Sequence, residues 1–163
     1  MALPDFLDRV VVRIGAVIAW AGVPLMVVTA AAEPLARWLR AADAPFTDVA
    51  TVAFLATIMT SFGYAYARGG HVRLDILSRR FAPRLNAAIE LVGTLLVLVP
   101  LCALVVIDGT ESAWRAFELG ERWADTSLPL QWLVRAWVPI GFLLLLLAAL
   151  ASALRALAVL YRR

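Results

Sequence analysis

Residues 49–67 read VATVAFLATIMTSFGYAYA, and residues 68–80 read RGGHVRLDILSRR. The first run has nineteen residues without a charge, which is long enough to cross about 30 Å of hydrocarbon as a helix. The second run is a polar block that holds His71, the only histidine of the chain. Gly69-Gly70 stands where the two runs meet, as glycine often does at the end of a helix. This change of composition is typical of a membrane helix followed by a loop.

The same alternation of apolar runs and polar blocks continues along all 163 residues. Hydrophobic residues make up 63% of the chain and its mean hydropathy is +0.86, whereas soluble domains are about 45–50% apolar. Apolar runs of membrane-spanning length lie at about 14–32, 49–67, 86–107 and 136–154. We therefore predict an all-α integral membrane protein, in which a single membrane domain (1–163) contains four transmembrane helices.

The run at 14–32 has an alternative interpretation as a cleaved signal peptide. The three alanines at 30–32 resemble the small residues of a cleavage site. The run is nineteen residues long, whereas the apolar core of a signal peptide has about 7–15 residues. This length favours a retained helix.

Short amphipathic helices are expected in the membrane interface between the spans. Glu33-Pro34 is expected to end the first span. Leu35, Trp38 and Leu39 then fall at i, i+3 and i+4, with the tryptophan at head-group depth. Asp75 is placed to cap a second such helix.

Several residues inside the spans also have predictable roles. Pro83 is expected to open the third helix and Pro100 to kink it. Thr57 and Ser61 share a face of the second span, which indicates a helix–helix contact, with a substrate-lining role as the alternative. The five leucines at 143–147 are expected to face lipid.

The placement of arginine predicts how the chain crosses the membrane. All fifteen basic residues are arginines. Ten of them lie in the N-terminal lead, the 68–84 segment and the C-terminal tail, and five lie in the other two connections. Acidic residues show the opposite bias. Since loops rich in arginine stay in the cytoplasm, both termini are predicted to be cytoplasmic.

The residue inventory argues against an enzyme. His71 is the only histidine, so the spans offer no histidine pair for haem, and the sequence has no Cys/His cluster, P-loop or Ser/His pair. Cys102 lies in an apolar run and is interpreted as a small buried residue. No basic block interleaved with aromatic residues predicts nucleic-acid binding. The span centres are uncharged, whereas secondary transporters usually carry charges near the midplane, so a scaffold or accessory subunit is favoured.

The polar block and the last span resemble a known family. Gly63-Tyr64 and Arg68-Gly69-Gly70 lead into His71-Val72-Arg73-Leu74-Asp75-Ile76-Leu77. A second group leads into the last span and comprises Trp123, Ser127, Pro129, Trp132, Pro139 and Gly141. On these residues and on its four-span layout, the chain closely resembles the DctQ-like small membrane subunit of tripartite ATP-independent periplasmic (TRAP) transporters. The His-Val-Arg-x-Asp pattern is the more specific of the two signals.

The resemblance implies a three-part uptake system in the bacterial inner membrane. The partners would be a large DctM-like membrane subunit, a DctP-like periplasmic substrate-binding protein and membrane lipids, with no nucleic acid. The large subunit would move an organic acid or similar solute inward, driven by a sodium gradient. The small subunit would brace it and help dock the binding protein, without holding a cofactor, substrate or sodium site itself.

Two groups of charged residues are the candidate contacts with these partners. The group predicted to be cytoplasmic is hypothesised to dock the large subunit, because its charges exceed what orientation requires; it comprises His71, Arg73, Asp75, Arg79 and Arg80. The group predicted to be periplasmic is hypothesised to dock the binding protein and comprises Glu111, Glu118, Glu121 and Arg122. For the first group, a topogenic segment touching anionic lipids and a ligand site are the alternatives. For the whole chain, the alternatives are a self-sufficient small oligomeric transporter or channel, and a membrane assembly protein without a transport role.

Overall fold

The computed structural model describes residues 3–39, 45–69, 83–122 and 131–161, and every element in these ranges is helical. The elements are α1 (Leu3–Trp38), α2 (Phe46–Ala67), α4 (Pro83–Gly93), the π-helix η1 (Thr94–Leu98), α5 (Val99–Glu118) and α6 (Gln131–Tyr161). α4, η1 and α5 follow one another without a break. By length and composition, four helices can each cross a membrane: α1, α2, the continuous helix of α4 to α5, and α6. The predicted all-α membrane fold with four spans is confirmed.

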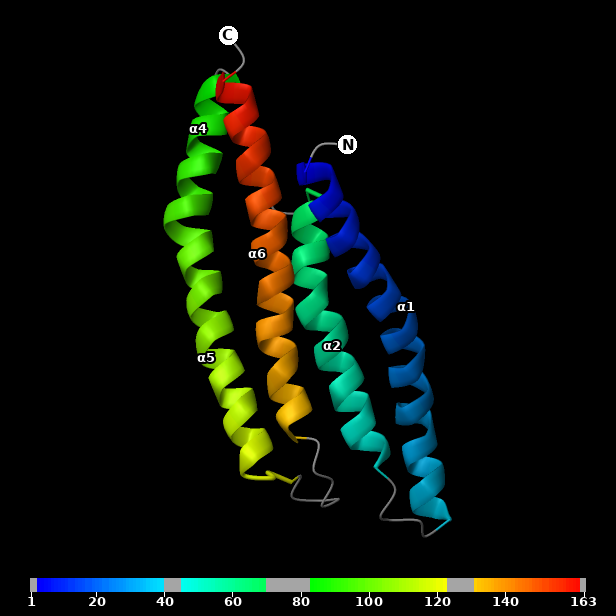
Figure 1. The fold of residues 1–163 in the computed structure, drawn as a ribbon. Coiled ribbons are helices and arrows are strands. Elements are labelled where there is room, and N and C mark those ends of the chain that lie inside the picture. Colours follow the sequence, from blue (N-terminus) through cyan, green and yellow to red (C-terminus); the bar gives the residue numbers. More distant parts are fainter. Residues whose placement is uncertain (1–2, 40–44, 70–82, 123–130, 162–163) are drawn as a thin grey trace.

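α6 is the central helix of the bundle. It packs against α1 and α2 on one side and against α4, η1 and α5 on the other (Figure 1). Both chain termini lie at the same end, which we call the terminal end; it also holds the end of α2 and the start of α4 (Figure 1). The opposite end, called the far end, holds the end of α1, the start of α2, the end of α5 and the start of α6.

α1 packs on α2 through small residues that recur every seven positions. Gly15, Gly22, Thr29 and Ala36 are buried along one face of α1. A Cβ atom added at Gly15 would lie 2.9 Å from the Cβ of Tyr64, so the two helices approach closely there. A repeat of small residues is how membrane helices come within van der Waals contact, because lipid supplies no hydrophobic force between them.

Hydroxylated residues of α2 face its neighbours, as the sequence predicted in part. The Thr57 hydroxyl donates to the Ala53 carbonyl oxygen at 2.8 Å, and its side chain lies against Gly22 of α1. Thr60 is 1% exposed and donates to the Ala56 carbonyl oxygen at 2.7 Å. Ser61 is exposed instead. The predicted helix–helix contact is therefore confirmed for Thr57 and not for Ser61.

α2 and α6 approach each other closely at two glycines. A Cβ atom added at Gly141 would lie 2.5 Å from the Met59 carbonyl oxygen, and one added at Gly63 would lie 2.9 Å from the Leu144 carbonyl carbon. Leu144, which packs against Gly63, and Leu145 are both buried, so the expectation that the whole leucine run at 143–147 faces lipid is wrong. The central place of α6, with neighbours on both sides, is the physical reason.

The first helix runs past its predicted end. Pro34 lies inside α1, which continues to Trp38, so the expectation that Glu33-Pro34 ends the helix is wrong. An i,i+4 ion pair of 2.6 Å between Glu33 and Arg37 bridges this last part of the helix. Leu35 and Trp38 thus belong to α1 itself. The second expected interfacial helix, after Asp75, lies mostly outside the described residues.

The third membrane helix begins at Pro83, as predicted, and contains a π-helix before Pro100. The Val99 N–H donates to the Thr94 carbonyl oxygen, five residues back, where an α-helix would use four. Proline has no N–H and its ring crowds the preceding turn. A π-helix thus lies in the turn before Pro100, and the kink expected at Pro100 stays a prediction.

Candidate partner interface

Exposed charges gather at the far end of α5. Glu111 forms an ion pair with Arg115 one turn further on, and both side chains are exposed. Glu118 accepts a hydrogen bond of 2.8 Å from Nε1 of Trp114. Arg122 is exposed just beyond the helix. Because these pairs lie four residues apart on one helix surface, they stabilise α5 locally and leave the charged groups accessible.

Glu121 sits in a different environment from the rest of its predicted group. Its Oε2 lies 2.5 Å from Nη2 of Arg135 on α6, and both side chains are half-buried. Nη1 of Arg135 lies 3.4 Å from the Ser112 hydroxyl of α5. Nearby, the rings of Phe117 and Trp132 meet edge to face with centroids 5.6 Å apart. This cluster ties the end of α5 to the start of α6, and the docking role of Glu121 stays a prediction.

In the sequence, the predicted cytoplasmic group lies between the end of α2 and the start of α4. The described residues stop at Gly69 and resume at Pro83, so His71, Arg73, Asp75, Arg79 and Arg80 fall outside them. Gly69 has a φ of 73°, a conformation that glycine adopts readily, and it follows the last turn of α2. The structure thus places the two flanks of this block at the terminal end (Figure 1).

Two polar contacts tie α6 to its neighbours at the terminal end. Arg155 of α6 forms an ion pair with Oδ2 of Asp8 on α1, whose side chain is 16% exposed. Oδ1 of Asp8 is buried without a hydrogen-bond partner among the described residues. The Ser152 hydroxyl donates to Glu90 on α4. These contacts join residues that are far apart in the sequence, and sequence patterns gave no signal for their pairing.

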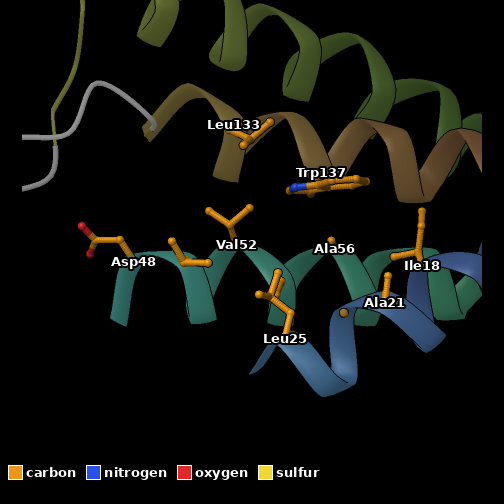
Figure 2. Close-up of a pocket in the computed structure, with 11 residues that line it drawn as sticks. Ile18, Ala21, Leu25, Asp48, Val52, Ala56, Leu133 and Trp137 are labelled. Carbon is orange, nitrogen blue, oxygen red and sulfur yellow. The ribbon is translucent and has the colours of Figure 1, made fainter. Parts of the chain in front are cut away.

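A groove lies between α1, α2 and α6, toward the far end. Its volume is about 390 Å³, and its lining is apolar except for Asp48 at the start of α2 and the indole of Trp137 on α6. Figure 2 shows Asp48 at one end of the groove and the Trp137 ring over its middle, with Ile18 beyond. Asp48 is only 4% exposed. It lies in the first turn of α2.

α1 presents a second apolar surface on the side away from α2. Val17, Trp20, Val27 and Val28 are all largely exposed, and the indole-bearing residue Trp20 reaches 82%. At 100° per residue these positions lie opposite the buried face that contains Gly22. We call these four residues the outward ridge of α1. Trp20 stands near the middle of the helix, whereas membrane tryptophans gather at the two interfaces.

Comparison with known protein families identifies the family of this chain. Residues 25–159 match the family described as "Tripartite ATP-independent periplasmic transporters, DctQ component". The chain belongs to the DctQ family. The resemblance inferred from the polar block and the last span is therefore confirmed. No curated protein and no solved structure matches the chain.

Membership of the DctQ family makes the chain a component of a membrane transporter. DctQ proteins are the small membrane component of a tripartite complex with DctM and DctP, and the family is not an enzyme family. Within residues 3–39, 45–69, 83–122 and 131–161, no group of three or more His, Cys, Asp and Glu residues could hold a metal ion.

Sequence reasoning missed the residues that the fold of this DctQ chain brings together across helices. Neither Asp48 nor Trp137 belongs to a sequence motif that would single it out. Their common groove needs the packing of three helices to form. For the outward ridge, the sequence contains one weak signal, which is the position of Trp20 inside a long apolar run. Membrane tryptophans are more usual at the two interfaces.

Proposed function

We propose that this chain braces the large DctM-like subunit of a TRAP transporter and helps dock a DctP-like periplasmic binding protein. The transporter would import an organic acid or similar solute across the bacterial inner membrane, driven by a sodium gradient. The observation that carries the bracing role is the outward ridge of α1, on a chain that belongs to the DctQ family. The organic acid and the sodium coupling rest on the family resemblance alone.

The outward ridge has the composition of a protein contact. Trp20 offers a large rigid ring at a depth where lipid gives its N–H group no acceptor. Tryptophan is enriched among the residues that dominate the binding energy of interfaces. The β-branched neighbours Val17, Val27 and Val28 lose little side-chain freedom in a contact, because a helix already fixes their rotamers. A partner helix that packs on this ridge would bury all four residues.

Substitution of Trp20 tests this role. We expect Trp20→Ala to weaken the association with the large subunit by about 2 kcal/mol or more, which is a factor of about thirty in affinity. Yield of the large subunit in co-purification from detergent, followed over a dilution series, measures the effect. Leu104→Ala is the matched control, because Leu104 is 60% exposed on α5 at the opposite edge of the bundle. Equal yields from the two variants would contradict the proposal.

The polar block after α2 is proposed as a second contact with the large subunit, on the cytoplasmic side. Its support is the excess of charge in this block and the distribution of arginines, which predicts that both termini are cytoplasmic. The alanine variants of His71, Arg73 and Asp75 are each expected to reduce co-purification of the large subunit. Unchanged complex yield together with unchanged solute uptake would remove this part of the proposal.

The exposed charges of α5 and beyond are proposed as the docking surface for the binding protein. Glu111, Glu118 and Arg122 lie at the far end, which is periplasmic if the termini are cytoplasmic. Charges at the rim of an interface steer a partner into place more than they hold it. A subunit with this role transports nothing by itself, so the chain reconstituted alone into vesicles is expected to give no solute flux. Flux from the chain alone would favour a self-sufficient transporter instead.

A further inference from the structure

Pro24 lies inside α1 on the same outward side as Trp20. Both residues are exposed. They are four positions apart, so they are neighbours on the helix surface, separated by about 40° around the axis. α1 lies at one edge of the bundle (Figure 1). An exposed proline therefore stands beside the tryptophan of the outward ridge.

Pro24 leaves the backbone carbonyl oxygen of Trp20 without its usual donor. In an α-helix the N–H group of each residue donates to the carbonyl oxygen four positions earlier. Residue 24 is the one that would serve Trp20, but proline has no N–H group. The N–H group of the next residue, Leu25, belongs in the same pattern to Ala21. The Trp20 carbonyl oxygen is thus an acceptor without a helical donor, between two exposed residues.

The Trp20 side chain adds a donor at the same place. It is 82% exposed, so its Nε1–H group is accessible to whatever surrounds α1. Pro24 is the eleventh residue of the nineteen-residue apolar run at 14–32. At about 1.5 Å per residue, the Trp20 carbonyl oxygen therefore lies near the centre of the hydrocarbon layer. One short stretch of α1 thus presents a donor and an acceptor at a depth where water is absent.

Lipid cannot satisfy these two groups. Acyl chains carry neither a donor nor an acceptor near the bilayer centre, and an unpaired polar group there is unfavourable. A wholly apolar helix would not satisfy them either, because its backbone groups bond to one another. A charged side chain would itself be costly at this depth. The remaining candidates are uncharged polar side chains that both donate and accept, which are serine, threonine, asparagine and glutamine. Such residues form hydrogen bonds between membrane helices.

We propose that the outward ridge receives a membrane helix of the large subunit that carries one uncharged polar residue at the level of Trp20 and Pro24. This residue accepts a hydrogen bond from Nε1 of Trp20 and donates one to the Trp20 carbonyl oxygen. The inference rests on the proposed bracing role of the ridge and adds the chemistry of the partner residue. The ridge supplies packing, whereas the polar contact fixes how far the partner helix is displaced along α1, as a single polar residue sets the register of a coiled coil.

Two substitutions remove the polar groups one at a time. Trp20→Phe keeps an aromatic ring but removes the donor. Pro24→Ala supplies an N–H group that occupies the Trp20 carbonyl oxygen within α1. Each is expected to weaken association with the large subunit about three- to tenfold, the effect of one hydrogen bond, measured by co-purification over a dilution series. Pro34→Ala is the matched control and should change nothing, because Pro34 is also exposed within α1 but lies beyond the apolar run.

The results separate this inference from the bracing role. Wild-type association of both Trp20→Phe and Pro24→Ala, with weakened association of Trp20→Ala, overturns the polar contact and leaves the bracing role standing. Equal association of Trp20→Ala and Leu104→Ala contradicts the bracing role, and the polar contact falls with it. Circular dichroism confirms that each variant is folded.

A photo-crosslinker covers the case in which Pro24→Ala acts by changing the shape of α1. Val23 is 47% exposed and next to Pro24, so benzoylphenylalanine at this position of the complete transporter samples what lies against the ridge. Mass spectrometry should identify a peptide of the large subunit with serine, threonine, asparagine or glutamine within one helical turn of the crosslink. Capture of lipid alone, or of a helix without such a residue within that turn, overturns the inference.

Discussion

Single glycines determine how closely the membrane helices of this chain approach each other. At Gly141 the backbone of α6 comes so near to α2 that an added Cβ atom would lie 2.5 Å from the Met59 carbonyl oxygen. The neighbour is backbone, which cannot swing aside as a side chain could. Thr60, which is buried on α2, donates its hydroxyl to the backbone of its own helix and so has no free donor for a neighbouring helix. Close backbone packing therefore takes the place of the hydrophobic force that lipid does not provide.

Gly141→Ala tests this account of the α2–α6 contact. The added methyl group must push the helices apart, and we expect a loss of about 1–3 kcal/mol in the free energy of unfolding, the usual effect of overpacking. The midpoint of an SDS titration in mixed micelles measures it. Gly93→Ala is the control, since a Cβ atom there meets nothing within 4 Å, and alanine is a better helix former than glycine by about 1 kcal/mol. Similar destabilisation by both substitutions would contradict the packing argument.

At the scale of elements, α6 holds the other helices together. Close contacts at Gly141 and Gly63 join it to α2 along the middle, Arg155 joins it to α1, and Ser152 joins it to α4. A membrane helix with neighbours on both sides cannot keep a leucine run wholly toward lipid. At the terminal end, Arg155 pairs with one oxygen of the Asp8 carboxylate. The other oxygen is buried without a partner among the described residues, so the carboxylate depends on this ion pair.

A double-mutant comparison tests the tie between α1 and α6. Arg155→Ala strands the Asp8 carboxylate, and we expect the free energy of unfolding to fall by about 1–3 kcal/mol. In the double variant with Asp8→Ala and Arg155→Ala, the free energy of unfolding should fall by less than in Arg155→Ala alone, because no buried charge is left without a partner. The exposed pair of Glu33 and Arg37 serves as the control, and Arg37→Ala should change stability by no more than about 1 kcal/mol. A double variant less stable than Arg155→Ala would argue against a stranded charge at Asp8.

Much of the element pattern was predictable, and the exceptions have local causes. The apolar runs located all four spans, and Pro83 marked the start of α4, because both signals act within one helix. The end of α1 was mistaken because Pro34 is tolerated inside a long helix whose last turns carry an ion pair. The groove with Asp48 and Trp137 was not predictable, since it depends on how α1, α2 and α6 pack. Periodicity specifies the face of a helix, but it does not specify which helix lies against that face.

At the scale of the whole molecule, the two ends of the bundle differ in the kind of charge that they carry. The terminal end holds both termini and the flanks of an arginine-rich block. The far end carries the carboxylates of Glu111 and Glu118 on an exposed part of α5. Because the centres of the spans are uncharged, each end can contact a different partner without a polar path through the membrane between them. The proposed division of contacts between the large subunit and the binding protein follows this polarity.

Charge reversal at the far end tests the docking of the binding protein. Glu111→Arg combined with Glu118→Arg should lower the affinity of the reconstituted transporter membrane subunits for the binding protein about tenfold. The reason is that charges at the rim of an interface set the association rate. The loss should appear mainly in the association rate and should shrink as salt screens the charges. Asp5→Arg, an exposed acidic position at the terminal end, is the matched control and should leave binding unchanged. An affinity that stays the same in the double variant, at both low and high salt, would place the docking surface elsewhere on the transporter.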